Sequence, residues 1–199
     1  MDRGEHVDKN VVSFIENCLF TTLTNVNFDP EAHVSLLKES QKIKENLRSA
    51  VGQPDNPTEH ATYNLPDNKT EMLQDAPMAG IMYAKDLDED IRSLRQLIVY
   101  GLKGVSAYGH QARELGYYSD QVDDFYIRAL EAVTDDRLSV EELIRVSMQT
   151  GEMAFEVMKK LDEANTNVYQ NPTPHLVNTH IKKGPFIICL LYTSDAADE

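Results

Sequence analysis

The side chains that could hold a metal or attack a substrate are few in this chain of 199 residues, and they are widely spaced. There are two cysteines, Cys18 and Cys189, in no CxxC pattern. An iron–sulfur cluster is usually held by about four thiolates, so the chain alone does not supply the ligands of one. A disulfide framework is excluded in practice. Cys18 lies on the apolar side of an expected helix, which indicates a buried, unreactive thiol.

Six histidines give one pair with metal-ligand spacing. His110 and Glu114 stand one helical turn apart, which could place two ligands on one face. An exposed polar pair on the outer side of the helix is the favoured interpretation. Glu31 and His33 are two residues apart, so on a helix they diverge, and no HExxH motif is present. Three further histidines lie in expected loops without companion ligands: His60, His175 and His180.

Other chemistries find no support in the motifs. The string from Gly101 to Gly104 contains Lys103 but lacks the GxxxxGK[ST] pattern of a phosphate loop and sits inside an expected helix. No serine or cysteine has a readable histidine and acid arrangement beside it. The residues therefore predict no catalytic, cofactor-binding or metal-binding position in this chain.

The net charge of the chain limits the classes of binding partner. A formal net charge of -14 and a pI near 4.8 argue against nucleic acid and against an anionic membrane surface. No apolar run approaches the roughly 20 residues that span a bilayer. The first ten residues are polar, which is unlike a signal peptide. A cytoplasmic, soluble protein is expected.

One long helix organises the expected fold, over Asp88–Gly116. Acidic residues stand at its start, and Gly116 stands where a left-handed C-cap is expected. Gly101 and Gly104 inside it indicate close packing of another helix. Its apolar residues recur at three- and four-residue steps and predict one buried stripe: Ile91, Leu94, Leu97, Ile98, Leu102, Val105, Tyr108, Ala112 and Leu115.

Further helices are predicted on both sides. Residues 11–23 form an amphipathic helix, and Asp29-Pro30-Glu31 is a strong start for the next, which ends near Ala50. Residues 52–68 are loop-like, residues 70–73 add a helical turn, and residues 78–84 are ambiguous between strand and helix. Ser119 caps a helix that continues to residue 133. A capping box from Ser139 to Glu142 starts the last long helix, residues 164–180 are irregular, and residues 186–188 form a strand.

An internal repeat is expected from matching apolar patterns. Val11, Phe14 and Leu19 match Val122, Phe125 and Leu130 at a constant offset. The predicted fold class is all-α, with two repeated three-helix-bundle halves of which the first lacks a helix. The expected units are 1–51 (incomplete first bundle), 52–87 (connecting loop region), 88–164 (second bundle) and 165–188 (linker and first strand of a truncated α/β domain). Met1 is therefore expected to be an internal start or a truncation point.

Four blocks carry a family resemblance in a consistent order. They are LFTTLTNVNFD at residues 19–29, YGLKG with the following helix at residues 100–116, LDEANTNVYQNPT at residues 161–173 and KKGPFI at residues 182–187. Together they resemble the hybrid cluster proteins, also called prismane proteins or hydroxylamine reductases. Residues 189–199 (CLLYTSDAADE) do not resemble the family. They read as a translated sequencing adapter, so a non-native tail is expected rather than a natural acidic one.

The resemblance implies an iron–sulfur oxidoreductase that reduces hydroxylamine to ammonia and water, with nitric oxide reduction as a proposed alternative. It implies a 4Fe–4S cluster, a hybrid iron–sulfur–oxygen cluster and a redox partner protein. The family's cluster ligands would precede residue 1 and follow residue 188, so none falls on this sequence and the fragment is expected to be inactive and free of cofactor. A second interpretation stays open, a cofactor-free acidic helical module that works by binding a partner.

Overall fold

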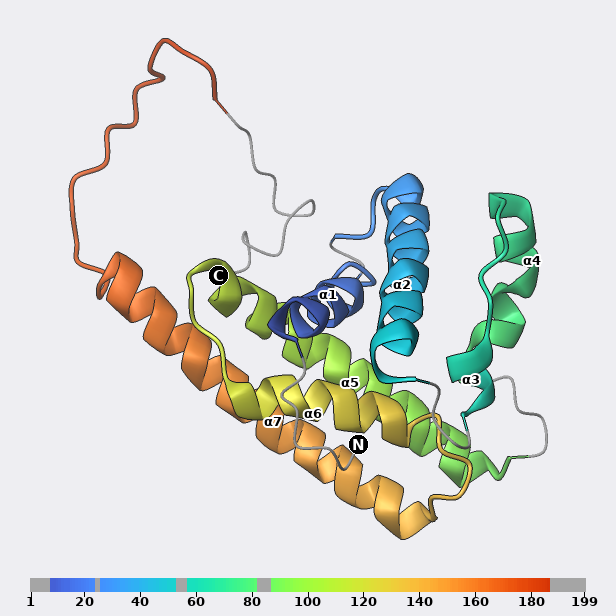
Figure 1. Ribbon diagram of the computed structural model, residues 1–199. Coiled ribbons are helices and arrows are strands. Elements are labelled where there is room, and N and C mark those ends of the chain that lie inside the picture. The colour runs from blue at the N-terminus through green and yellow to red at the C-terminus, as the bar shows by residue number, and fades with distance from the viewer. Residues whose placement is uncertain (1–7, 24–25, 53–56, 82–86, 187–199) are drawn as a thin grey trace.

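All regular structure in the described part of the chain is helical. The computed structural model describes residues 8–23, 26–52, 57–81 and 87–186, and within these ranges there are seven helices and no strand (Figure 1). No helix in these ranges has both the length and the apolar character needed to cross a bilayer. The helices are α1 Lys9–Phe20, α2 Pro30–Val51, α3 Glu59–Thr62, α4 Lys69–Ala79, α5 Glu89–Glu114, α6 Asp120–Ala132 and α7 Val140–Tyr169.

The helix ends are set by capping interactions between residues that are close in sequence. The Asp29 side chain accepts a hydrogen bond from the Glu31 amide at the start of α2, with proline at the first helical position. Ser139 and Glu142 form the predicted capping box at the start of α7. At the end of α5, Gly116 has φ +83°, and the amides of Gly116 and Tyr117 donate to Arg113 and Ala112. That is the Schellman pattern, which favours glycine because of the positive φ.

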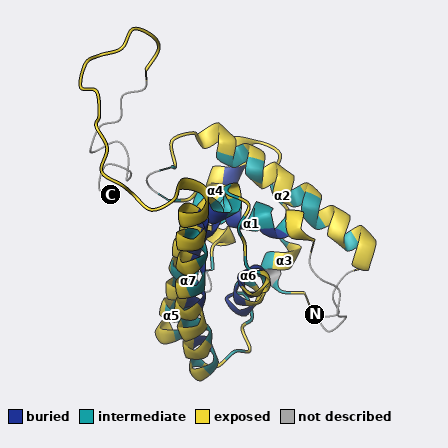
Figure 2. Cartoon of the chain, turned by 90° about the vertical axis from the view of Figure 1, so that its left-hand side faces the viewer, coloured by how far each residue is buried: buried dark blue, intermediate teal, exposed yellow. Residues whose placement is uncertain are grey.

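The core lies between the two long helices α5 and α7, which run parallel to each other, and the shorter helices α6 and α1. Figure 2 shows the buried residues between these helices and exposed residues along the outer sides of α5 and α7. Apolar side chains at helical spacing bury one stripe on each helix. The fully enclosed members of the core include Val12, Ile98, Leu102, Val105, Phe125, Tyr126, Ala129, Leu143 and Val157.

The buried stripe of α5 is rotated relative to the predicted one. Arg95 and Gly109 are buried, whereas Leu97 and Tyr108, which were expected inside, are substantially exposed. Arg95 can be buried because its Nη2 donates to the Asp135 carbonyl and to Asp136 Oδ1, both at 2.9 Å. A guanidinium that is paired through Nη2, although its Nε has no hydrogen-bond partner among the described residues, thus takes a core position that hydrophobicity alone assigns elsewhere. In α1 the buried positions are Val12 and Glu16, while the predicted apolar side is only half-buried.

The two glycines inside α5 differ in their surroundings. A Cβ at Gly101 would lie 2.6 Å from Thr150 Cγ2, so this glycine allows α7 to pack closely, as predicted. A Cβ at Gly104 would meet nothing within 4 Å. The prediction of close packing is therefore wrong for Gly104.

Helices α2, α3 and α4 lie outside this core. No residue of α2 is buried, and α1 packs on α5 and α6 rather than on α2. Polar contacts join α2 to the segments after it: Lys69 pairs with Glu31, and Arg48 donates to the Ala61 carbonyl at 2.6 Å. The repeated two-half architecture, with its superposition of residues 11–47 on residues 122–158, stays a prediction.

Several segments differ from their predicted extent. The region 52–87, expected as a connecting loop, contains α3 and α4, and α7 continues to Tyr169, past the expected end near residue 164. Most of the strand expected at residues 186–188 and the whole tail 189–199 lie outside the described residues, and Phe186 is not in a strand. Residues 170–186 form an exposed segment without helix or strand that leaves the end of α7 (Figure 1).

Candidate functional site

A cluster of buried charged and polar side chains lies where α1, α5 and α6 meet. Glu16 comes from α1, Arg113 from α5, and Asp123 and Tyr126 from α6. Glu16, Asp123 and Tyr126 are each at most 5% exposed, which is unusual for carboxylates. The cluster therefore joins three helices, and its two carboxylates and its hydroxyl are almost fully shielded from water.

Arg113 bridges the two carboxylates. Its Nε lies 3.0 Å from Glu16 Oε1, and its Nη2 lies 3.3 Å from Glu16 Oε2 and 2.5 Å from Asp123 Oδ1. Two carboxylates share one guanidinium. When Glu16 and Asp123 are both ionised, the cluster therefore has a net charge of −1. Asp123 Oδ2 and the Tyr126 hydroxyl have no hydrogen-bond partner among the described residues.

Gly109 makes room for the cluster. A Cβ at this position would lie 2.8 Å from Glu16 Oε2 and 3.2 Å from the Tyr126 hydroxyl. The Tyr126 hydroxyl and the Glu16 carboxylate thus both approach the backbone of Gly109. A glycine inside a helix costs about 1 kcal/mol in helix propensity, and here it allows α1 to bring a carboxylate against α5.

Burial sets the protonation behaviour of the cluster. Burial raises the pKa of Glu16 and that of Asp123 above the ordinary carboxyl range, and the charge and hydrogen bonds of Arg113 only partly offset this. Burial, then the charge of Glu16, raises the pKa of Tyr126. Burial alone would lower the pKa of Arg113, but its hydrogen bonds to Glu16 and Asp123 raise it overall. The cluster thus favours uptake of a proton by its carboxylates.

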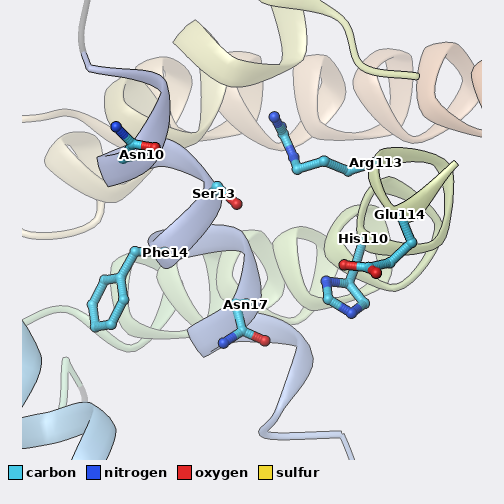
Figure 3. A pocket seen from close by; sticks show the side chains of 7 residues that line it. All are labelled: Asn10, Ser13, Phe14, Asn17, His110, Arg113 and Glu114. Atoms are coloured by element: carbon cyan, nitrogen blue, oxygen red, sulfur yellow. The ribbon is translucent and has the colours of Figure 1, made fainter. Parts of the chain in front are cut away.

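A polar cleft adjoins the cluster. Its volume is about 460 Å³, and Figure 3 shows its lining side chains from α1 and α5. The His110 ring stacks on Phe20 with the centroids 4.4 Å apart. The lining residues are Asn10, Ser13, Phe14, Asn17, His110, Arg113 and Glu114.

The predicted pair His110 and Glu114 thus lines this cleft together and faces α1. Both residues were expected to be exposed on the outer side of α5. Glu114 is exposed, whereas His110 is partly covered. The described residues contain no group of three or more histidine, cysteine or acidic side chains placed to hold a metal ion. The cleft is therefore a polar groove with two ligand-type side chains and no third.

The remaining predicted candidates are dispersed. His33 bridges two segments, with Nδ1 2.9 Å from the Asp29 carbonyl and Nε2 3.0 Å from the Thr21 carbonyl. These hydrogen bonds, to Asp29 first, raise its pKa. Glu31 pairs with Lys69. His60, His175 and His180 belong to no such ligand group among the described residues.

Cys18 is half-buried and free. Burial, with a smaller contribution from Glu39, raises the pKa of its thiol to about 11. The thiolate is the form that ligates metals and attacks disulfides, so this cysteine is unreactive near neutral pH. With one described cysteine in that state, the described residues do not fit an iron–sulfur cluster.

Motif analysis missed the buried charge cluster. Glu16 and Arg113 are 97 residues apart, and none of the four residues belongs to a catalytic motif. One signal was available: Glu16 follows Val12 by one helical turn, so a buried Val12 carries Glu16 onto the same face.

The family profile and the curated relatives that match this chain indicate the same family. The profile of the Prismane/CO dehydrogenase family matches residues 2–190. A hydroxylamine reductase of Desulfitobacterium hafniense strain DCB-2 is 36% identical over 187 residues, which cover 92% of this chain and 34% of that protein. The Bacteroides thetaiotaomicron hydroxylamine reductase is 37% identical over 192 residues, covering 94% of this chain and 33% of that protein. The chain thus spans about a third of the length of the curated relatives it matches.

Proposed function

The chain belongs to the Prismane/CO dehydrogenase family, and we propose that it is the helical part of a hydroxylamine reductase that acts in the cytoplasm. The observation that supports the proposal is the sequence identity of 36–37% to proteins of that name over nine-tenths of this chain. In the proposed reaction, hydroxylamine accepts two electrons and two protons, its N–O bond breaks, and ammonia and water are released. Nitric oxide is a second candidate substrate.

The proposed contribution of this chain is a scaffold. The full-length protein would hold a 4Fe–4S cluster and a hybrid iron–sulfur–oxygen cluster, and a redox partner protein would supply the electrons. The ligands for both clusters would lie outside this chain, because its described residues do not fit them. On its own the chain would then be inactive.

Within the scaffold, the cluster of Glu16, Arg113 and Asp123 fixes the orientation of α1. A guanidinium that contacts carboxylates from two other helices resists sliding and rotation at their junction, since charge-assisted hydrogen bonds are short and directional. Arg95 does the same at the other end of α5, where it holds the turn between α6 and α7. Neither arginine is assigned a role in the chemistry.

The experiment is to read the genomic locus on both sides of the coding segment for residues 1–188. We expect an upstream frame containing a cysteine motif and a downstream frame that continues past residue 188. The complete gene product is then expressed and assayed for hydroxylamine reduction. Stop codons immediately on both sides would overturn the proposal and favour a free-standing helical interaction module.

A further inference from the structure

The outer side of α7 carries an apolar stripe that no described element covers. Its core side is marked by Leu143, Thr150, Val157 and Ala164, which recur every seven residues. A second set alternates steps of four and three on another side of the helix: Ile144, Met148, Gly151, Phe155 and Met158. Such a pattern is that of a helix face packed against a neighbour.

The neighbouring helix α5 extends this surface. Ile144 of α7 and Leu97 of α5 line the same shallow groove between the two helices. Tyr108 lies three turns after Leu97 on the same side of α5. We call the surface formed by Leu97, Tyr108, Ile144, Met148, Gly151, Phe155 and Met158 the outer apolar face.

The outer apolar face is large for a surface in contact with water. Its six large side chains are between 40% and 71% exposed. Side chains of this size bury about 150–250 Å² when aromatic, so half-exposed ones leave roughly 100 Å² each and roughly 600 Å² together. This apolar area is at the upper end of the range for the largest apolar patch on a typical monomer. It is also at the lower end of the range of areas buried between domains.

The centre of the face permits close approach. A Cβ at Gly151 would meet nothing within 4 Å, so the backbone of another element can come nearer here than over any larger residue. Met148 and Met158 flank it, and flexible thioether side chains adapt to an incoming surface.

The exposed segment after α7 indicates the occupant. Residues 170–186 can span roughly 55 Å when extended, whereas α7, with 30 residues, is about 45 Å long. A domain joined through this segment can therefore reach any point along α7. The segment also exposes large apolar side chains of its own, including Leu176 and Ile181, which are almost fully uncovered.

We propose that the outer apolar face is the docking surface for the domain that follows residues 170–186 in the full-length protein. The inference rests on the proposed function, because it takes this chain to be about a third of a longer protein, as in its relatives. The occupant presents an apolar helix or loop that lies across Gly151, and its docking leaves α4 and the far side of the molecule uncovered.

Methionine oxidation tests the proposal with standards inside the chain. Met148 and Met158 lie on the face, Met153 is buried in the core at 5% exposure, and Met78 is 51% exposed on α4. Dilute hydrogen peroxide is applied to the 199-residue chain and to the full-length protein, and sulfoxide is measured for each methionine by peptide mass spectrometry. Oxidation follows exposure.

In the 199-residue chain we expect Met148 and Met158 to oxidise as fast as Met78, and Met153 to be slow. In the full-length protein, Met148 and Met158 should slow by about tenfold, while Met78 keeps its rate. Full-length protein in which Met148 and Met158 keep the rate seen in the short chain would overturn the proposal. Protection already present in the short chain, and lost on dilution, would overturn it in favour of a second copy.

Substitutions separate docking from folding. Phe155→Asp in the full-length protein should restore the oxidation of Met148 and Met158, with the helical circular dichroism unchanged. Leu73→Asp, at a position of similar exposure on α4, is the matched control and should leave their protection intact. If Phe155→Asp does not fold, the wild-type comparison decides alone.

The failure of the docking and the failure of the proposed function give different results. Unprotected methionines in a full-length protein that reduces hydroxylamine contradict only the docking. Protected methionines in a full-length protein without that activity contradict only the proposed function.

Discussion

Replacing Arg113 by glutamine removes the only cation among the described residues that forms an ion pair with the buried carboxylates of Glu16 and Asp123. Breaking a buried ion pair by removing one partner costs about 3–5 kcal/mol, because the other charge stays buried. The Arg113 side chain is 17% exposed, so we expect the lower end, about 3 kcal/mol. For a chain of this length, that corresponds to a fall in Tm of about 6–12 °C.

The deficit should depend on pH in a defined direction. Burial raises the pKa of Glu16 and of Asp123, so the folded chain binds protons more tightly than the unfolded chain does. The contribution of these groups to stability therefore increases as pH falls through their raised folded pKa values, and it levels off near the ordinary carboxyl pKa of about 4. Losing Arg113 raises both pKa values further, so the difference between Arg113→Gln and wild type should narrow on acidification.

The assay is urea unfolding followed by far-ultraviolet circular dichroism at about pH 7.5 and about pH 5.5, for wild type and Arg113→Gln. Arg137→Gln is the control, because the Arg137 side chain is 84% exposed and pairs with one carboxylate, Asp135, and it should lower the midpoint much less than Arg113→Gln does. Adding Glu16→Gln and Asp123→Asn to Arg113→Gln should recover most of the loss at neutral pH. A neutral-pH midpoint equal to that of wild type, or a deficit that widens in acid, would refute the account of the cluster.

Three further predictions concern the scaffold. Gly101→Ala should destabilise the chain by about 1–3 kcal/mol because its Cβ would overlap Thr150, whereas Gly104→Ala should stabilise it by up to about 1 kcal/mol; equal effects in chemical denaturation would contradict the packing described. Hydrogen exchange should show the amides of α2 opening before those of α5 and α7, since α2 has no buried residue; equal protection would mean that α2 is covered in solution. Reconstitution with iron and sulfide should leave the 199-residue chain without a stable charge-transfer chromophore, and a stoichiometric one lost on Cys18→Ala would show the ligand argument to be wrong.

The parts of the fold that the sequence predicted correctly depend on neighbours along the chain. The caps at Asp29, Ser139 and Gly116 each need only a few consecutive residues, so their signals are complete within a short window. Val122 and Phe125, two of the apolar positions named from the sequence of α6, are buried in the core as their helical spacing predicts.

The errors come from contacts between distant segments. Hydrophobicity placed Leu97 and Tyr108 inside, but the structure buries Arg95 and Gly109 on that helix. The hydrogen bond to Asp136 offsets the cost of burying Arg95, and the approach of Glu16 requires a glycine at position 109. Both partners, Asp136 and Glu16, lie far away in the sequence. The length of α4 was underestimated: a single turn was expected over residues 70–73, whereas the helix continues past Pro77 to Ala79.

The central claim is that this chain is part of a hydroxylamine reductase, and electron counting tests it most directly. The full-length gene product is supplied with a reduced viologen dye, and dye oxidation and ammonia release are measured together as hydroxylamine is added. The account predicts two electrons consumed for each ammonia formed, and no hydroxylamine-dependent dye oxidation by the 199-residue chain alone. A full-length protein that carries its clusters but releases no ammonia would contradict it.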